Sequence, residues 1–118
     1  MDEKKMNQLA AANIDVQEAL DRFMGNEGLL MKFLLRFPQD ESFQQLKQAM
    51  EVKDTDQAYR AAHALKGLAG NLAMKSLYEQ ACSVMSDLRE GDLNTAQGKM
   101  AELESQYQGV LDALQSIQ

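Results

Sequence analysis

Apolar residues recur at helical spacing through most of the chain, in segments that each end at a glycine, a proline or a polar connector. This pattern predicts amphipathic helices, each of which must bury one face. Because the interruptions are too frequent for an extended rod, we expect the helices to fold back on one another. The single proline in 118 residues and the scarcity of β-branched and aromatic runs also argue against a sheet protein. The sequence therefore predicts an all-α fold.

The expected helices can be placed from their caps and breaks. A short helix over residues 4–12 precedes a second one that Asp15 caps and that Gly25-Asn26 ends. Residues 27–50 should form one long helix bent at Pro38. Three further helices are expected over residues 56–74, 75–90 and 93–117. We predict an antiparallel four-helix bundle with one or two short additional N-terminal helices, in a single domain over residues 1–118.

Charge and composition limit the partners. A formal net charge of −6 disfavours nucleic acid and anionic membranes, which bind clustered Lys and Arg. The lone Cys82 cannot form an internal disulfide, and the start of the chain lacks the apolar segment of a signal peptide. We expect a cytoplasmic protein without membrane insertion. A monomer is the expected state, because no long apolar seam is left unassigned.

The segment from Ala58 to Leu72 contains the only histidine, His63. On a helical wheel His63 lies opposite the apolar face, so its imidazole should point to solvent. A lone histidine in a helical protein is ordinarily a surface or core residue without a special role. The residues next to His63 favour a functional role instead. The apolar face itself should consist of Ala58, Ala61, Ala62, Leu65, Leu68, Ala69 and Leu72.

Two glycines and a lysine follow His63 on the outer face. Gly67 and Gly70 should each destabilise a helix by up to about 1 kcal/mol relative to alanine, so another property must favour them. Removing the Cβ atoms would let another backbone or a bulky group approach the imidazole, although Gly70-Asn71 could also mark a helix end. Lys66 could offset the charge of a phosphoryl group on the ring, or could be an ordinary solvated lysine.

The chemistry available to His63 is narrow. An exposed imidazole is largely neutral at cell pH, is a good nucleophile, and is a good leaving group once phosphorylated. A metal site would need further His or Cys ligands, and acid–base catalysis would need a pocket. We therefore expect no metal site, and a reversible group transfer on His63.

The run His63-Ala64-Leu65-Lys66-Gly67, followed by Ala69, Gly70 and Asn71, resembles the signature of histidine-containing phosphotransfer (Hpt) domains. Residues 14–27, 29–37 and 89–92 also resemble segments of this family, so the likeness extends over most of the chain. Leu68 and Ala73 differ from the small residue and the glycine that are common there. Met85 stands where the family often has a polar residue near the imidazole.

The resemblance implies a four-helix bundle in which His63 is the phosphoacceptor, Lys66 its electrostatic partner and Gly67 the residue that leaves room for the receiver. Gly70 is carried over as a further binding residue. The implied function is transfer of a phosphoryl group between aspartates of receiver domains in a multistep two-component phosphorelay. The protein would then be a phosphocarrier without its own ATP site or turnover. It would need no cofactor, with Mg²⁺ expected on the receiver partner only.

Receiver domains and a hybrid sensor kinase are the expected partners. Leu20, Phe23, Met24 and Leu30 are candidates for an apolar docking patch, although each is more readily explained as core. The alternative function is a helical binding or antikinase module that acts on a receiver or kinase without being phosphorylated. A third is the phosphoacceptor domain of a chemotaxis-type kinase cut from a larger chain, although the initiating Met1 favours a free-standing protein.

Overall fold

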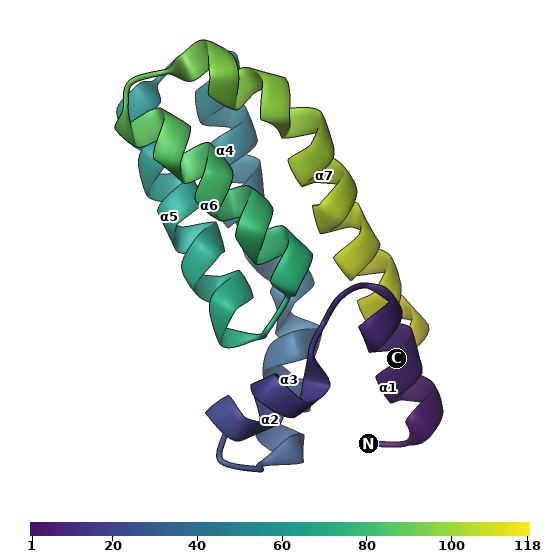
Figure 1. Cartoon of the computed structure of the whole chain (residues 1–118). Coiled ribbons are helices and arrows are strands. Elements are labelled where there is room, and N and C mark those ends of the chain that lie inside the picture. Colours follow the sequence, from purple (N-terminus) through teal and green to yellow (C-terminus); the bar gives the residue numbers. More distant parts are fainter.

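The computed structural model describes all 118 residues as seven α-helices and one short 3₁₀-helix, without a strand. Three short helices come first, followed by four that form the body of the molecule (Figure 1). The all-α prediction is therefore confirmed. The helices are α1 (Glu3–Ala11), α2 (Val16–Arg22), α3 (Glu27–Arg36), the 3₁₀-helix η1 (Phe37–Gln39), α4 (Ser42–Glu51), α5 (Thr55–Asn71), α6 (Lys75–Arg89) and α7 (Leu93–Ser116).

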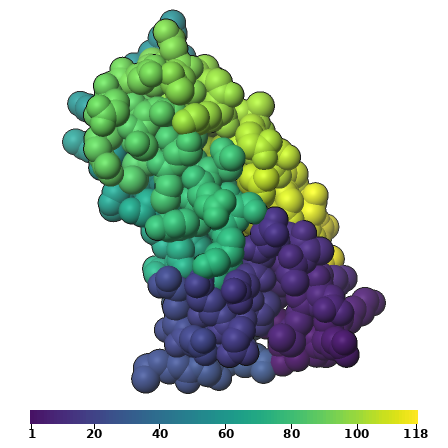
Figure 2. Space-filling view, viewed as in Figure 1, coloured from purple at the N-terminus to yellow at the C-terminus, as the bar shows by residue number.

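Helices α4 to α7 form the predicted antiparallel four-helix bundle. Each packs against the next along the chain, and α4 also contacts α7, which closes the bundle. Their connections span only residues 52–54, 72–74 and 90–92, so consecutive helices must run in opposite directions. The molecule measures 43 × 24 × 20 Å, and the N-terminal helices cover one end of its long axis (Figure 2). There α1 packs against α7.

Acidic and amide side chains begin most of the helices. In α1, α2, α3, α5 and α7 the residue before the helix accepts a hydrogen bond from a backbone N–H in the first turn. These bonds satisfy donors that a helix leaves free at its start. The predicted cap at Asp15 is confirmed, and Asp54 caps α5 in the same way.

The long bent helix predicted over residues 27–50 is two helices instead. Helix α3 ends at Arg36, η1 contains Pro38, and α4 starts only at Ser42. A proline has no N–H to donate and its ring crowds the preceding turn, so the break is complete rather than a bend. Asp40 then accepts a hydrogen bond from the Ser42 N–H at 2.9 Å, which helps to start the new helix.

One apolar core joins all the helices. Buried side chains from α1 through α7 belong to the same cluster, which includes Leu9, Leu34, Leu65 and Leu103. The rings of Phe43 and Tyr107 stack at 4.2 Å between centroids and tie α4 to α7. No helix of the structure is both long enough and apolar enough to cross a membrane.

Four non-glycine residues adopt left-handed backbone conformations, and two of them close bundle helices. Lys53 (φ 59°) follows α4, and Ala73 (φ 53°) follows α5. Ala73 explains why α5 stops at Asn71 although the apolar pattern had predicted a helix through Met74: the chain reverses there to begin α6. A left-handed residue after a helix is a common way to end it, and glycine suits that place best.

Replacing Lys53 with glycine is expected to raise the free energy of unfolding by about 0.5–1 kcal/mol. The left-handed conformation destabilises a non-glycine residue by roughly 1–2 kcal/mol, and the greater freedom of glycine in the unfolded chain offsets part of that gain. Urea unfolding, monitored by circular dichroism, measures the change in the free energy of unfolding. Gln48→Gly, an exposed change inside α4, is the control and should destabilise by about 1 kcal/mol. A less stable Lys53→Gly variant would contradict the prediction.

Candidate functional site

Helix α5 buries one face in the bundle and exposes the other, largely as predicted. Ala58, Ala61, Ala62, Leu65 and Ala69 are buried along its inner face. Leu68 was expected on the same face but is only half-buried, because it lies at the border with α3 and η1, next to Phe33 and Phe37. The inner face of α5 thus packs against the rest of the bundle, and the outer face is open to solvent.

His63 lies on the outer face of α5 with an exposed side chain, which confirms its predicted orientation. No side chain or backbone group forms a hydrogen bond with its ring. Its aromatic neighbour is Tyr59, one turn earlier, at 6.2 Å between ring centroids and an interplanar angle of 44°. The imidazole is therefore open to an approaching reactant.

Tyr59 is itself in contact with the next helix. The Arg89 guanidinium, from the last turn of α6, lies over the Tyr59 ring at 6.0 Å from its centroid. Arg89 forms no ion pair, so its charge is not neutralised within the chain. Neither residue was among the predicted site residues. Tyr59 could have been found from its spacing of four from His63, whereas Arg89 comes close only through the packing of α5 against α6.

Lys66 and Gly67 lie one turn beyond His63. Lys66 is half-buried and has no acidic partner, so its ammonium remains available to a ligand. At Gly67 an added Cβ would meet no atom within 4 Å, so nothing inside the chain requires a glycine there. Both residues border a groove of about 310 Å³ between α5, α2 and the start of α6.

Gly70 lies deeper in the same groove and differs from Gly67. A Cβ at Gly70 would come within 3.1 Å of Cε1 of Tyr78, a side chain of α6. The neighbouring Cys82 side chain raises the pKa of Tyr78, which the charges of Arg22 and Lys75 lower to a smaller extent. A neighbouring side chain thus restricts position 70 and none restricts position 67, and the binding roles of both glycines stay predictions.

The comparison with family models identifies the family of the chain. The Hpt domain model matches residues 31–116, from within α3 to the end of α7. The chain belongs to the Hpt domain family. Hpt domains perform histidine phosphotransfer in two-component signalling and are phosphocarrier modules rather than catalytic enzymes. No curated protein and no solved structure matches the chain.

Three positions differ from the usual Hpt pattern: Leu68, whose half-buried position is described above, Ala73 and Met85. Ala73 occupies a place where glycine is common, and it holds the left-handed conformation that glycine adopts most easily. Met85 replaces the polar residue expected near the imidazole, and its side chain is buried with 5% of its surface exposed. Met85 cannot orient the His63 ring by a strong hydrogen bond, since a thioether is only a weak acceptor.

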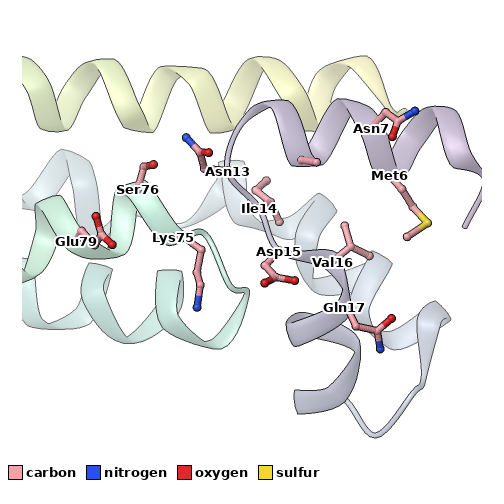
Figure 3. Close-up of a pocket in the computed structure, with 11 residues that line it drawn as sticks. Met6, Asn7, Asn13, Ile14, Asp15, Val16, Gln17, Lys75, Ser76 and Glu79 are labelled. Carbon is pink, nitrogen blue, oxygen red and sulfur yellow. The ribbon is translucent and has the colours of Figure 1, made fainter.

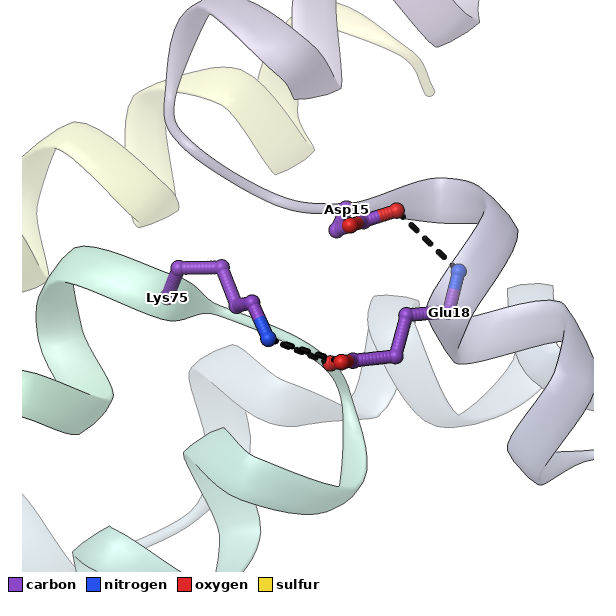
Figure 4. A network of polar contacts seen from close by, with 3 residues as sticks. All are labelled: Asp15, Glu18 and Lys75. Atoms are coloured by element: carbon purple, nitrogen blue, oxygen red, sulfur yellow. Dashed lines mark hydrogen bonds and ion pairs between the residues drawn. The ribbon is translucent and has the colours of Figure 1, made fainter.

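The first 30 residues lie outside the matched span, yet they contact the turn that follows α5. The backbone of Ile14 pairs with Met74 in the turn after α5. The Lys75 ammonium donates to both carboxylate oxygens of Glu18 at 2.7 and 2.8 Å, and Asp15 caps the helix that carries Glu18 (Figure 4). The segment from Ile14 to Glu18 therefore fixes the turn that joins α5 to α6.

The proposed apolar patch is only partly at the surface. Leu30 is fully buried, and Leu20 and Phe23 are half-buried. Met24 is 94% exposed in the turn between α2 and α3. Phe33 is also exposed, and its ring lies 5.5 Å from that of Phe23. The core explanation thus holds for Leu30, and the turn before α3 leaves apolar surface uncovered.

A second hollow is larger but lies apart from His63. It has a volume of about 590 Å³ and lies between α1, the segment that leads into α2, and the start of α6 (Figure 3). Its lining includes Met6, Asn13 and Glu79 but no residue of α5. The structure brings together no three His, Cys, Asp or Glu side chains able to hold a metal ion.

Proposed function

We propose that this Hpt protein carries a phosphoryl group on His63 between aspartates of receiver domains in a multistep two-component phosphorelay. The observation that carries the proposal is the exposed imidazole on the outer face of α5, without a hydrogen bond and with an unpaired lysine and an unobstructed glycine one turn away. Family membership supplies the reaction class, and the geometry favours His63 as the residue that performs it.

The transfer needs only one nucleophile from this chain. A neutral ring nitrogen of His63 attacks the phosphorus of an aspartyl phosphate, so that a P–N bond forms while the P–O bond to the aspartate breaks. The electron pair of that bond leaves on the receiver's carboxylate. Reversal of these steps on a second receiver passes the group onward. We expect the receiver to supply Mg²⁺, since the charge on the transferring group must be neutralised.

Lys66 supports this transfer by charge. Its ammonium extends from the turn that follows His63 and has no acidic partner to compete for it. A charge-assisted hydrogen bond from a lysine to a phosphoryl oxygen would stabilise the phosphorylated imidazole. Lys66 would thereby lengthen the life of the carrier state.

Gly67 supports the transfer by leaving room for the receiver domain. The surface around Gly67 is open, and the half-buried Leu68 and the exposed Phe33 lie on the adjoining flank. A receiver domain could bring its own backbone close to α5 there while apolar contacts hold it. We expect the protein to act as a cytoplasmic monomer that meets a hybrid sensor kinase and one or more receivers.

The test is transfer itself. Purified protein is mixed with a set of receiver domains phosphorylated on aspartate, and base-stable, acid-labile phosphate on the chain is measured. A second, unphosphorylated receiver is then added. Movement of the label to that receiver supports the relay. Tight binding to a receiver without any label would favour the antikinase alternative instead.

Replacing Lys66 with glutamine is expected to shorten the half-life of the phosphorylated protein roughly threefold to tenfold, because one hydrogen bond to a charged group is lost. Stability should stay nearly constant, since Lys66 has no ion pair to lose. Decay of the isolated phosphoprotein measures the effect. Lys53→Gln, an exposed lysine in the turn after α4, serves as the charge-matched control. Equal decay of both variants would contradict the role of Lys66.

A further inference from the structure

We propose that Tyr59 is a positioning residue for His63, and that Arg89 holds Tyr59 in the orientation this requires. This inference rests on the proposed function and identifies what orients the reactive ring. Nothing in the structure hydrogen-bonds the imidazole, and the position where the family commonly has a polar residue is the buried Met85. The ring therefore needs another means of orientation.

Helix geometry brings Tyr59 to the imidazole. Side chains on a helix lean toward its N-terminus, so the His63 ring lies over the turn that carries Tyr59. The two rings are 6.2 Å apart at 44°, within the range in which aromatic pairs attract each other through tilted contacts. The contact limits the rotation of the imidazole and leaves its outer edge free for an incoming phosphoryl group.

Arg89 restrains Tyr59 from the other helix. Its guanidinium lies over the Tyr59 ring at 6.0 Å, a distance at which a cation is attracted to an aromatic face. Arg89 has no carboxylate partner that would hold it elsewhere. Because α6 runs antiparallel to α5, the last turn of α6 lies beside the first half of α5. Arg89 of α6 therefore contacts Tyr59 of α5, which in turn contacts His63.

Both contacts of Tyr59 are made by its ring, so we expect the ring rather than the hydroxyl to orient His63. Two substitutions separate these contributions. Tyr59→Phe keeps the ring, and Tyr59→Leu removes it while leaving an apolar side chain. We expect transfer from a phosphorylated receiver to be unchanged within about twofold in Tyr59→Phe and roughly fivefold to tenfold slower in Tyr59→Leu, as for a misoriented nucleophile. Arg89→Gln should be slowed to a smaller extent.

A second readout does not depend on phosphate. The proton resonances of the His63 ring in the NMR spectrum should move in Tyr59→Leu, because the ring current of Tyr59 is lost, and should stay in place in Tyr59→Phe. A melting curve for each variant reports folding. If Tyr59→Leu fails to fold, Tyr59→Met takes its place.

The outcomes separate the two proposals. If wild-type protein acquires no label, the phosphorelay proposal fails whatever the NMR spectra show. If wild type is labelled and Tyr59→Leu matches its rate and spectrum, the positioning role of Tyr59 is overturned. If Tyr59→Phe is slowed as much as Tyr59→Leu, the hydroxyl and not the ring is the active group, which also overturns it. Equal rates in Arg89→Gln and wild type would overturn the part assigned to Arg89.

Discussion

Replacement of His63 by glutamine is expected to abolish phosphorylation completely and to leave the fold intact. The glutamine amide nitrogen has no lone pair available to attack phosphorus, and the chain has no second histidine to take over. The side chain is exposed and forms no hydrogen bond, so its loss removes no packing. Exposed substitutions of this kind change the free energy of unfolding by less than about 0.5 kcal/mol.

Two measurements on this variant answer separate questions. Acid-labile phosphate after incubation with phosphorylated receivers should fall from substantial labelling to background. The melting temperature should move by no more than about 2 °C, given the size of the chain. Residual labelling at the wild-type level would mean that another residue accepts phosphate. A large loss of stability would contradict the exposed position of the imidazole.

Gly67→Gln is expected to slow transfer from a receiver by roughly 10- to 100-fold, because a side chain there would hold the partner away from the imidazole. The isolated protein should become more stable by up to about 1 kcal/mol, since glutamine is the better helix former and the added atoms meet nothing in the chain. Opposite changes in stability and in function are the signature of a residue kept for a partner.

The chain offers a matched control for this experiment. Gly98 is an exposed glycine inside α7 where an added Cβ also meets nothing within 4 Å. Gly98→Gln should give the same gain in stability, measured by urea unfolding, without any change in transfer rate. Equal transfer by the Gly67 and Gly98 variants would contradict the clearance role of Gly67.

Gly70 shows why these two glycines could not be distinguished from the sequence. Both lie on the outer side of one helix, and both raised the expectation of room for a partner, although Gly70-Asn71 could also have marked a helix end. Whether a neighbour already uses that room depends on where Tyr78 of α6 is placed, which is decided by the turn at residues 72–74 and by the packing of α6 on α5. Only the assembled structure answers that question.

What the sequence by itself determined was local. The alternation of apolar and polar residues set which face of α5 is buried and placed His63 on the exposed one, because the helix repeat alone gives the direction of each side chain. Side chains such as Asp15 and Asp54 set where helices begin, because their caps are formed within the first turn. The signature around His63 indicated the family for the same reason: its residues are contiguous.

Only the tertiary structure decided which residues from distant parts of the chain meet. It placed Arg89 of α6 over Tyr59 of α5, paired Glu18 with Lys75 across the groove, and left Leu68 half-buried at the border with α3. A periodic pattern gives the direction of a side chain but not the partner it meets, because the partner depends on the register and crossing of packed helices.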